Sequence, residues 1–86
     1  MVSQTAEPKL ELYHFESCPY CAKVRRFIES SGLKSKITYF DTRLDSAAHG
    51  RLEKMTGDDQ VPCLVIDGEP MLESDDIIAW LKSNVV

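Results

Sequence analysis

The run Cys18-Pro19-Tyr20-Cys21 stands where a strand pattern in the sequence gives way to a helix pattern. Residues 9–15 alternate between polar and apolar side chains, which is typical of a β-strand. Pro19 suits the first position of a helix, because the backbone N–H that proline lacks would have no partner there. The chain is therefore predicted to place a strand, a tight junction and a helix in succession, with both cysteines at the junction.

Helix and strand patterns continue to alternate up to about residue 57. The helix that begins at or near Cys18 has an apolar stripe, formed by Val24, Phe27 and Ile28. Residues 37–40 are mostly β-branched or aromatic, which predicts a second strand. The next helix pattern rests on four apolar residues, Leu44, Ala48, Leu52 and Met55. Gly32 and Gly57 are stop signals for these helices, and Gly50 predicts that the second one is short or irregular.

A β-hairpin and a last helix are predicted for the rest of the chain. Residues 63–66 form a buried strand pattern, and the next two residues, Asp67-Gly68, are a dipeptide preferred in type I′ hairpin turns. Pro70 predicts that the returning strand, residues 69–72, lies at an edge of the sheet. Ser74 is a preferred N-cap for the last helix, and two aspartates follow it in the first turn. The predicted order is β-α-β-α-β-β-α, an α/β domain.

The composition indicates one small domain and argues against several classes of partner. The 86 residues have room for a single domain, residues 9–86, after an N-terminal tail, residues 1–8, that we expect to be mobile. The net charge is −4 with no block of like charges, so neither nucleic acid nor an anionic membrane is the expected partner. The tail has no apolar run typical of a signal peptide, so we expect a cytoplasmic protein, and a monomer by default.

The three cysteines favour redox chemistry over a disulfide scaffold or a zinc site. Their number and spacing do not suit a disulfide framework, and Cys63, His14 and His49 supply no second pair of zinc ligands. Thiol–disulfide exchange needs a reactive thiolate and a second thiol close by. Unpaired N–H groups at a helix start favour a thiolate at Cys18. Cys21, one turn further and buried, would then be the resolving thiol.

From residue 9 to residue 81 the sequence resembles the dithiol glutaredoxins. The Cys18-Pro19-Tyr20-Cys21 run matches their active-site motif, and Val61-Pro62 resembles a segment in which a cis proline faces the active site. Ser74-Asp75 resembles the pair that holds the γ-glutamyl carboxylate of glutathione. The resemblance implies a thioredoxin-like fold with a central four-stranded mixed sheet flanked by helices. It also implies glutathione as co-substrate, and glutathionylated or disulfide-bonded proteins as partners.

Two other segments look like the glutathione-binding segments of glutathione transferase N-terminal domains, namely Gln60-Val61-Pro62 and Glu73-Ser74. The two resemblances together imply seven glutathione-binding residues: Tyr20, Gln60, Val61, Pro62, Glu73, Ser74 and Asp75. Phe15 and Asp59 stand where many or some glutaredoxins carry a basic residue, so we expect weak binding of the glycine carboxylate of glutathione. His49 is expected to be a solvated helix histidine, and Cys63 a small apolar side chain in a buried strand.

The leading hypothesis is a glutathione-dependent thiol–disulfide oxidoreductase that reduces protein disulfides and glutathionylated substrates through Cys18. Two alternatives stay open. One is an iron–sulfur cluster carrier, in which two chains hold a cluster through Cys18 and two glutathiones, although Pro19 and Tyr20 argue against it. The other is a disulfide reductant fed by thioredoxin reductase, which Phe15 and Asp59 keep in view.

Overall fold

A computed structural model describes residues 8–85, so the predicted tail lies outside the described residues except for Pro8. The elements are β1 (Leu10–His14), α1 (Pro19–Ser30), a short 3-10 helix η2 (Lys34–Lys36), β2 (Ile37–Asp41), α2 (Ser46–Thr56), β3 (Cys63–Ile66), β4 (Glu69–Leu72) and α3 (Ser74–Asn84). Apart from η2, this is the predicted order. Within residues 8–85, every helix is too short or too polar to cross a membrane.

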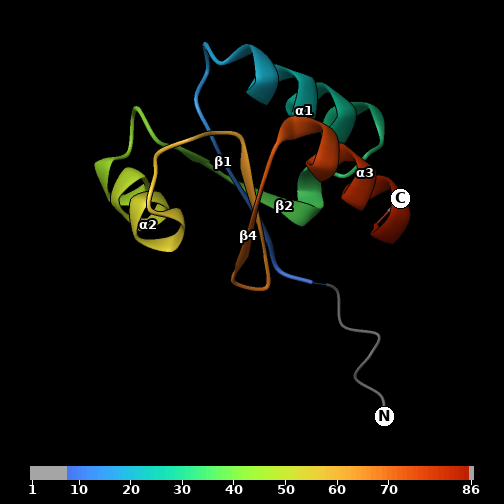
Figure 1. Cartoon of the computed structure of the whole chain (residues 1–86). Coiled ribbons are helices and arrows are strands. Elements are labelled where there is room, and N and C mark those ends of the chain that lie inside the picture. Colours follow the sequence, from blue (N-terminus) through green and yellow to red (C-terminus); the bar gives the residue numbers. More distant parts are fainter. Residues whose placement is uncertain (1–7, 86) are drawn as a thin grey trace.

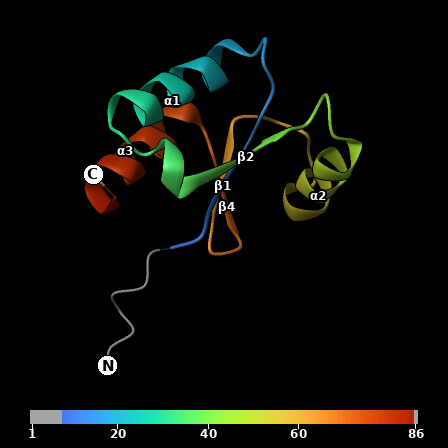
Figure 2. The same ribbon diagram turned by 180° about the vertical axis from the view of Figure 1, so that it is seen from behind.

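The four strands form one mixed sheet in the order β2-β1-β3-β4. β1 pairs parallel with β2 and antiparallel with β3, and β3 pairs antiparallel with β4. Helices α1 and α3 lie together on one face of the sheet and α2 covers the other (Figure 1; Figure 2 shows the same layers from behind). The carboxyl ends of β1 and β2 therefore meet at one edge of the sheet.

Alternation along the central strands divides the core into two layers. Leu12 of β1 and Leu64 of β3 are fully buried in the layer beneath α1 and α3. Tyr13 and Cys63, their neighbours in sequence, are buried on the opposite face beneath α2. Successive side chains of a strand point to opposite faces, so one short strand contributes to both layers. This explains how a chain of 86 residues covers both faces of its sheet.

Helix α2 differs from the prediction at its start and in its regularity. Leu44 lies before the helix and its side chain is 86% exposed, so it does not belong to the apolar stripe. Asp45 is the N-cap instead, and its carboxylate accepts hydrogen bonds from the backbone N–H groups of Ala47 and Ala48 at 3.0 and 3.2 Å. The helix then runs without interruption through Gly50 and ends at residue 56, as predicted.

The hairpin is confirmed, whereas the predicted cap of α3 is wrong by one residue. Asp67 and Gly68 both have positive φ, 49° and 89°, as a type I′ turn requires, and β4 lies at the sheet edge. The N-cap of α3 is Glu73, which has a φ of 77° and makes no side-chain capping hydrogen bond. Ser74 is therefore the first helical residue and is buried. With its positive φ, Glu73 turns the chain as it leaves β4, and α3 begins one residue earlier than predicted.

Candidate functional site

Cys18 is the N-cap of α1, at the junction that the sequence predicts. Its Sγ accepts a hydrogen bond from the backbone N–H of Cys21 at 3.2 Å, so the sulfur takes the place of a capping oxygen. The backbone N–H of Cys18 in turn donates to the carbonyl of Phe15 at 3.3 Å. The first turn of α1 contains no acidic residue that would oppose a negative charge there. The positive end of the helix dipole therefore faces the Cys18 sulfur.

The two cysteines of the motif lie in different surroundings. Cys21 is completely buried, and burial together with its hydrogen bond to Cys18 raises the pKa of its thiol to about 12. Cys18 is 5% exposed. This is less exposure than is expected for a thiol that must be reached by another sulfur atom. The capping contact folds its sulfur back against the helix start, and Cys18 reaches solvent through a cavity that it lines. An incoming sulfur must enter that cavity.

The first cavity has a volume of about 650 Å³ and lies at the carboxyl edge of β1 and β2. Its lining includes Phe15 and Arg43, and the Arg43 guanidinium lies over the Phe15 ring, 4.0 Å from the ring centroid. Sequence reasoning missed Arg43 and treated Phe15 as the loss of a cation. The signal was available in the topology, because residues that follow two parallel strands meet at one edge. Arg43 thus supplies positive charge to the corner that the sequence left empty.

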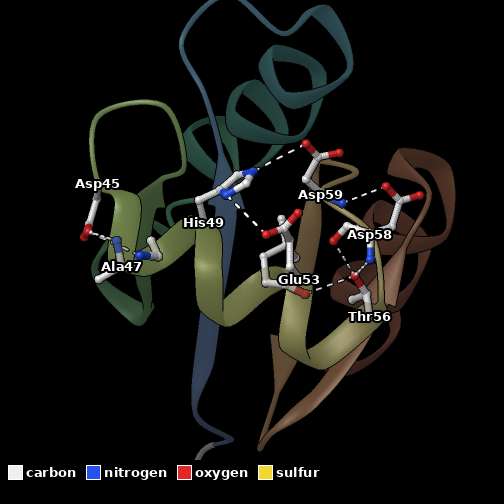
Figure 3. Close-up of polar contacts among 9 residues, drawn as sticks. Asp45, Ala47, His49, Glu53, Thr56, Asp58 and Asp59 are labelled. Carbon is white, nitrogen blue, oxygen red and sulfur yellow. Dashed lines mark hydrogen bonds and ion pairs between the residues drawn. The ribbon is translucent and has the colours of Figure 1, made fainter.

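His49 and Asp59 line the same cavity and are paired with each other (Figure 3). His49 Nε2 lies 3.4 Å from Asp59 Oδ2, and its Nδ1 lies 3.6 Å from Glu53 Oε1. His49 is therefore a partly exposed, paired residue rather than the solvated one that was expected. One ligand atom from each of these three residues lies within 4.8 Å of the others, a separation compatible with a metal ion. His49 lies within contact distance of both carboxylates, and both carboxylates are largely exposed.

A second cavity, of about 420 Å³, is bordered by all seven predicted glutathione-binding residues. They are joined by Lys23, and the full lining is Tyr20, Lys23, Gln60, Val61, Pro62, Glu73, Ser74 and Asp75. The predicted cis proline is confirmed, because the Val61–Pro62 peptide bond is cis. Gln60 and Val61 also line the first cavity, so the two hollows adjoin.

Charged and polar side chains in the second cavity form pairs that the sequence did not predict. Lys23 from α1 forms an ion pair with Asp75 from α3, which joins the two helices. Gln60 Nε2 donates to Glu73 Oε2 at 3.4 Å. Since Ser74 and Asp75 open α3, backbone N–H groups of its first turn lack helical partners, and such groups bind anions. The cavity thus offers donors and acceptors for a zwitterionic group.

Cys63 lies outside both cavity linings. It is completely buried beneath α2, where it packs with Tyr13, Ala48, Leu52 and Val65. Burial raises the pKa of its thiol to about 11. These surroundings support the expected role as a small apolar side chain, because a buried, protonated thiol is unreactive.

Fold and site together define a thioredoxin-like domain with a Cys-x-x-Cys pair at a helix start. The sequence model of the glutathione S-transferase N-terminal domain matches residues 12–85, and the chain belongs to that family. The thioredoxin-like fold and both resemblances predicted from the sequence are confirmed, with the transferase family matched over most of the chain.

Individual relatives come from both sides of this resemblance. Glutaredoxin-C4, chloroplastic, from Oryza sativa subsp. japonica is 33% identical over 68 residues, which are 78% of this chain and 51% of that protein. The chain thus spans about half the length of this relative. The crystal structure of the thioredoxin-like protein BC3987 is 30% identical with a TM-score of 0.74, over 90% of this chain and 100% of that one. An epsilon-class glutathione S-transferase from the housefly, Musca domestica, is 26% identical with a TM-score of 0.72, over 87% of this chain and 34% of that one.

Proposed function

We propose that the chain is a glutathione-dependent thiol–disulfide oxidoreductase in which Cys18 is the nucleophile and Cys21 the resolving thiol. One observation carries the proposal. The Cys18 sulfur caps a helix inside a cavity that adjoins a second cavity, and all seven residues expected to bind glutathione line the second one. The glutaredoxin and glutathione transferase relatives support a glutathione-related role.

The reaction begins when the Cys18 thiolate attacks the glutathione sulfur of a glutathionylated protein. The bond between substrate and glutathione breaks, a Cys18–glutathione disulfide forms, and the substrate leaves as a thiolate that takes up a proton. A second glutathione thiolate then attacks the bound glutathione, which releases glutathione disulfide and restores Cys18. In the alternative route, Cys21 attacks Cys18, releases glutathione and forms an internal disulfide that two further glutathiones reduce.

Glutathione is proposed to lie across the two adjoining cavities. Its γ-glutamyl carboxylate faces the backbone N–H groups at the start of α3, and its ammonium group faces the carboxylates of Glu73 and Asp75. The backbone of Val61, next to the cis proline, pairs with the cysteinyl part and aims its sulfur at Cys18. The glycine end then points into the first cavity, where Arg43 contributes a positive charge to the lining.

The proposal is tested by comparing two electron donors that could return the oxidised protein to its reduced form. The wild type should reduce a glutathionylated peptide with glutathione, NADPH and glutathione reductase, and much less with NADPH and thioredoxin reductase. Cys18→Ser should abolish turnover, whereas Cys63→Ala, the matched control, should retain it, because Cys63 is buried away from both cavities. Equal turnover by Cys18→Ser and wild type would overturn the assignment.

The same preparations separate the two rival functions. Faster turnover with thioredoxin reductase than with glutathione would favour the disulfide reductant fed by thioredoxin reductase, in which glutathione is not the electron donor. A stable visible absorbance band after anaerobic reconstitution with iron and sulfide, together with dimerisation on gel filtration, would favour the cluster carrier.

A further inference from the structure

Arg25 lies on α1, one helical turn beyond Cys21, and binds the segment that leads into Cys18. Its Nη1 lies 3.0 Å from His14 Nδ1 and donates to the carbonyl of Phe15 at 3.2 Å, while its Nη2 donates to the carbonyl of Glu16 at 3.1 Å. All three acceptors belong to the last residue of β1 and the two residues after it. One guanidinium thus fixes the strand-to-helix junction at three atoms.

The contact with His14 defines the state of that imidazole. A guanidinium has only donors, so His14 Nδ1 must accept and cannot carry a proton. Burial, and then the charge of Arg25, lower the pKa of His14, which agrees with a neutral ring. The carbonyl of Phe15 accepts from Arg25 and also from the backbone N–H of Cys18. The positive charge of Arg25 is therefore not neutralised by a carboxylate in these contacts.

The path of the Arg25 side chain brings its charge close to the resolving thiol. Residues at i and i+4 are neighbours on a helix surface, and helical side chains lean towards the N-terminus, so Arg25 extends along the turn that contains Cys21. The guanidinium reaches the carbonyl of Phe15, which also accepts from the backbone N–H of Cys18. Burial is the largest cause that raises the pKa of Cys21, while the Phe15 backbone and the Arg25 charge lower it.

We infer that Arg25 is a positioning residue for the resolving step, in which it stabilises the Cys21 thiolate that attacks the Cys18–glutathione disulfide. The inference rests on the proposed function. In this step Cys21 loses a proton to solvent, its sulfur bonds to that of Cys18, and the bond from Cys18 to glutathione breaks. Glutathione leaves as a thiolate and takes up a proton, so one disulfide replaces another without net oxidation.

The first step should depend little on Arg25, because a different contact holds the nucleophile. The Cys18 sulfur is fixed by the backbone N–H of Cys21, a group of the helix itself. Removal of the Arg25 charge should therefore slow the second step selectively. A residue that only stiffened the junction would affect both steps together.

The two steps can be separated by mixing the reduced protein with glutathione disulfide, quenching the reaction with acid at several times and measuring the products by mass spectrometry. In Arg25→Gln, formation of the Cys18–glutathione disulfide should stay within about twofold of wild type, while its conversion to the internal disulfide should slow about tenfold. Arg25→Lys, which keeps the charge, should recover most of the second-step rate. Arg26→Gln, the matched control, removes an exposed charge from the next position of the same helix and should change neither step.

Equal slowing of both steps in Arg25→Gln, or an unchanged second step, would overturn the inference while leaving the proposed function intact. A second step that is as slow in Arg25→Lys as in Arg25→Gln would also overturn it, because the geometry of the fork and not the charge would then matter. If the wild type forms no Cys18–glutathione disulfide at all, the proposed function itself fails. Circular dichroism of each variant establishes that the rates are compared between folded proteins.

Discussion

Arginine side chains define the polar surroundings of the cysteine pair at the residue scale. Arg25 binds the junction before Cys18 from within the helix, and Arg43 lies over the Phe15 ring on the side of the cavity. Both meet residue 15, where the sequence has an aromatic side chain in place of a cation. A planar guanidinium can stack on a ring and still present its donors to a ligand. The aromatic residue thus holds a cation that comes from another part of the chain.

If Arg43 binds the glycine carboxylate of glutathione as proposed, Arg43→Gln should raise the KM for glutathione about fivefold, because an exposed charge-assisted contact is lost. The same substitution should have no effect on the KM for glutathione whose glycine carboxylate is esterified. Lys34→Gln, a loss of charge in η2 before the start of β2, is the control. Steady-state turnover with both forms of glutathione measures the difference. An equal change for both forms would show that Arg43 does not bind this carboxylate.

Tyr39 has the one buried side-chain oxygen without a hydrogen-bond partner in the described part of the chain. Tyr39→Phe should therefore leave the free energy of unfolding unchanged or raise it by about 1 kcal/mol, because a buried hydroxyl without a partner is a cost to the native state. Urea unfolding measures this. A loss of about 1 kcal/mol or more would show that the hydroxyl forms a stabilising contact.

At the scale of the elements, the sequence predicted what short-range patterns decide. The strands, the type I′ turn and the edge position of β4 follow from alternation, Asp67-Gly68 and Pro70, and all are confirmed. The predicted start of α2 was wrong, because hydrogen bonds from the side chains of Asp41 and Asp45 to nearby backbone N–H groups outweigh the helical spacing of Leu44. Asp41 Oδ1 accepts from the backbone N–H groups of Arg43 and Leu44 at 2.9 and 3.0 Å, and so keeps Leu44 in a turn before the helix.

The site was predicted in the same uneven way. The cysteine pair and the seven lining residues were found from motifs, whereas Arg25 and Arg43 were not. The roles of both arginines depend on contacts with Phe15. Phe15 is 10 residues from Arg25 in sequence, and it follows β1 whereas Arg43 follows the neighbouring strand β2. A periodic pattern does not contain such contacts. The contact of Arg43 with Phe15 follows from the parallel pairing of β1 with β2, and that of Arg25 from the position of α1 beside the end of β1.

The capping role of Asp45 predicts a local loss of stability when it is removed. Asp45→Ala should lower the free energy of unfolding by about 1 kcal/mol, because two backbone N–H groups of α2 lose their acceptor. Asp45→Asn keeps an acceptor oxygen and should lose much less. Urea unfolding followed by circular dichroism distinguishes these variants. Equal stability of wild type and Asp45→Ala would contradict the assignment of this residue as the cap.

At the scale of the whole molecule, two buried thiols make the fold sensitive to alkaline pH. The pKa of Cys21 is raised from 9.0 to about 12 and that of Cys63 from 9.0 to about 11, mainly by burial. The native state therefore holds protons that the unfolded state releases. The stability is fully present below about pH 9 and is lost as the pH rises towards the native values.

Under reducing conditions the free energy of unfolding should fall between pH 9 and pH 11 by up to about 1.4 kcal/mol per pH unit for each thiol. Cys63→Ala removes one of the two groups and should reduce this slope by about half, whatever its effect on stability at neutral pH. Urea unfolding at several pH values gives the slopes. A stability that stays constant over this range, or an equal slope in the variant, would contradict the burial of these thiols.

The adjoining cavities bring residues from both ends of the chain to one edge of the molecule, with Cys18 in the first and the start of α3 in the second. The most direct test is to incubate Cys21→Ser, which cannot resolve a mixed disulfide, with glutathione disulfide and to map the product by peptide mass spectrometry. We predict one glutathione per chain, attached to Cys18. Attachment to Cys63, or no attachment while the protein remains folded, would contradict glutathione chemistry at this site.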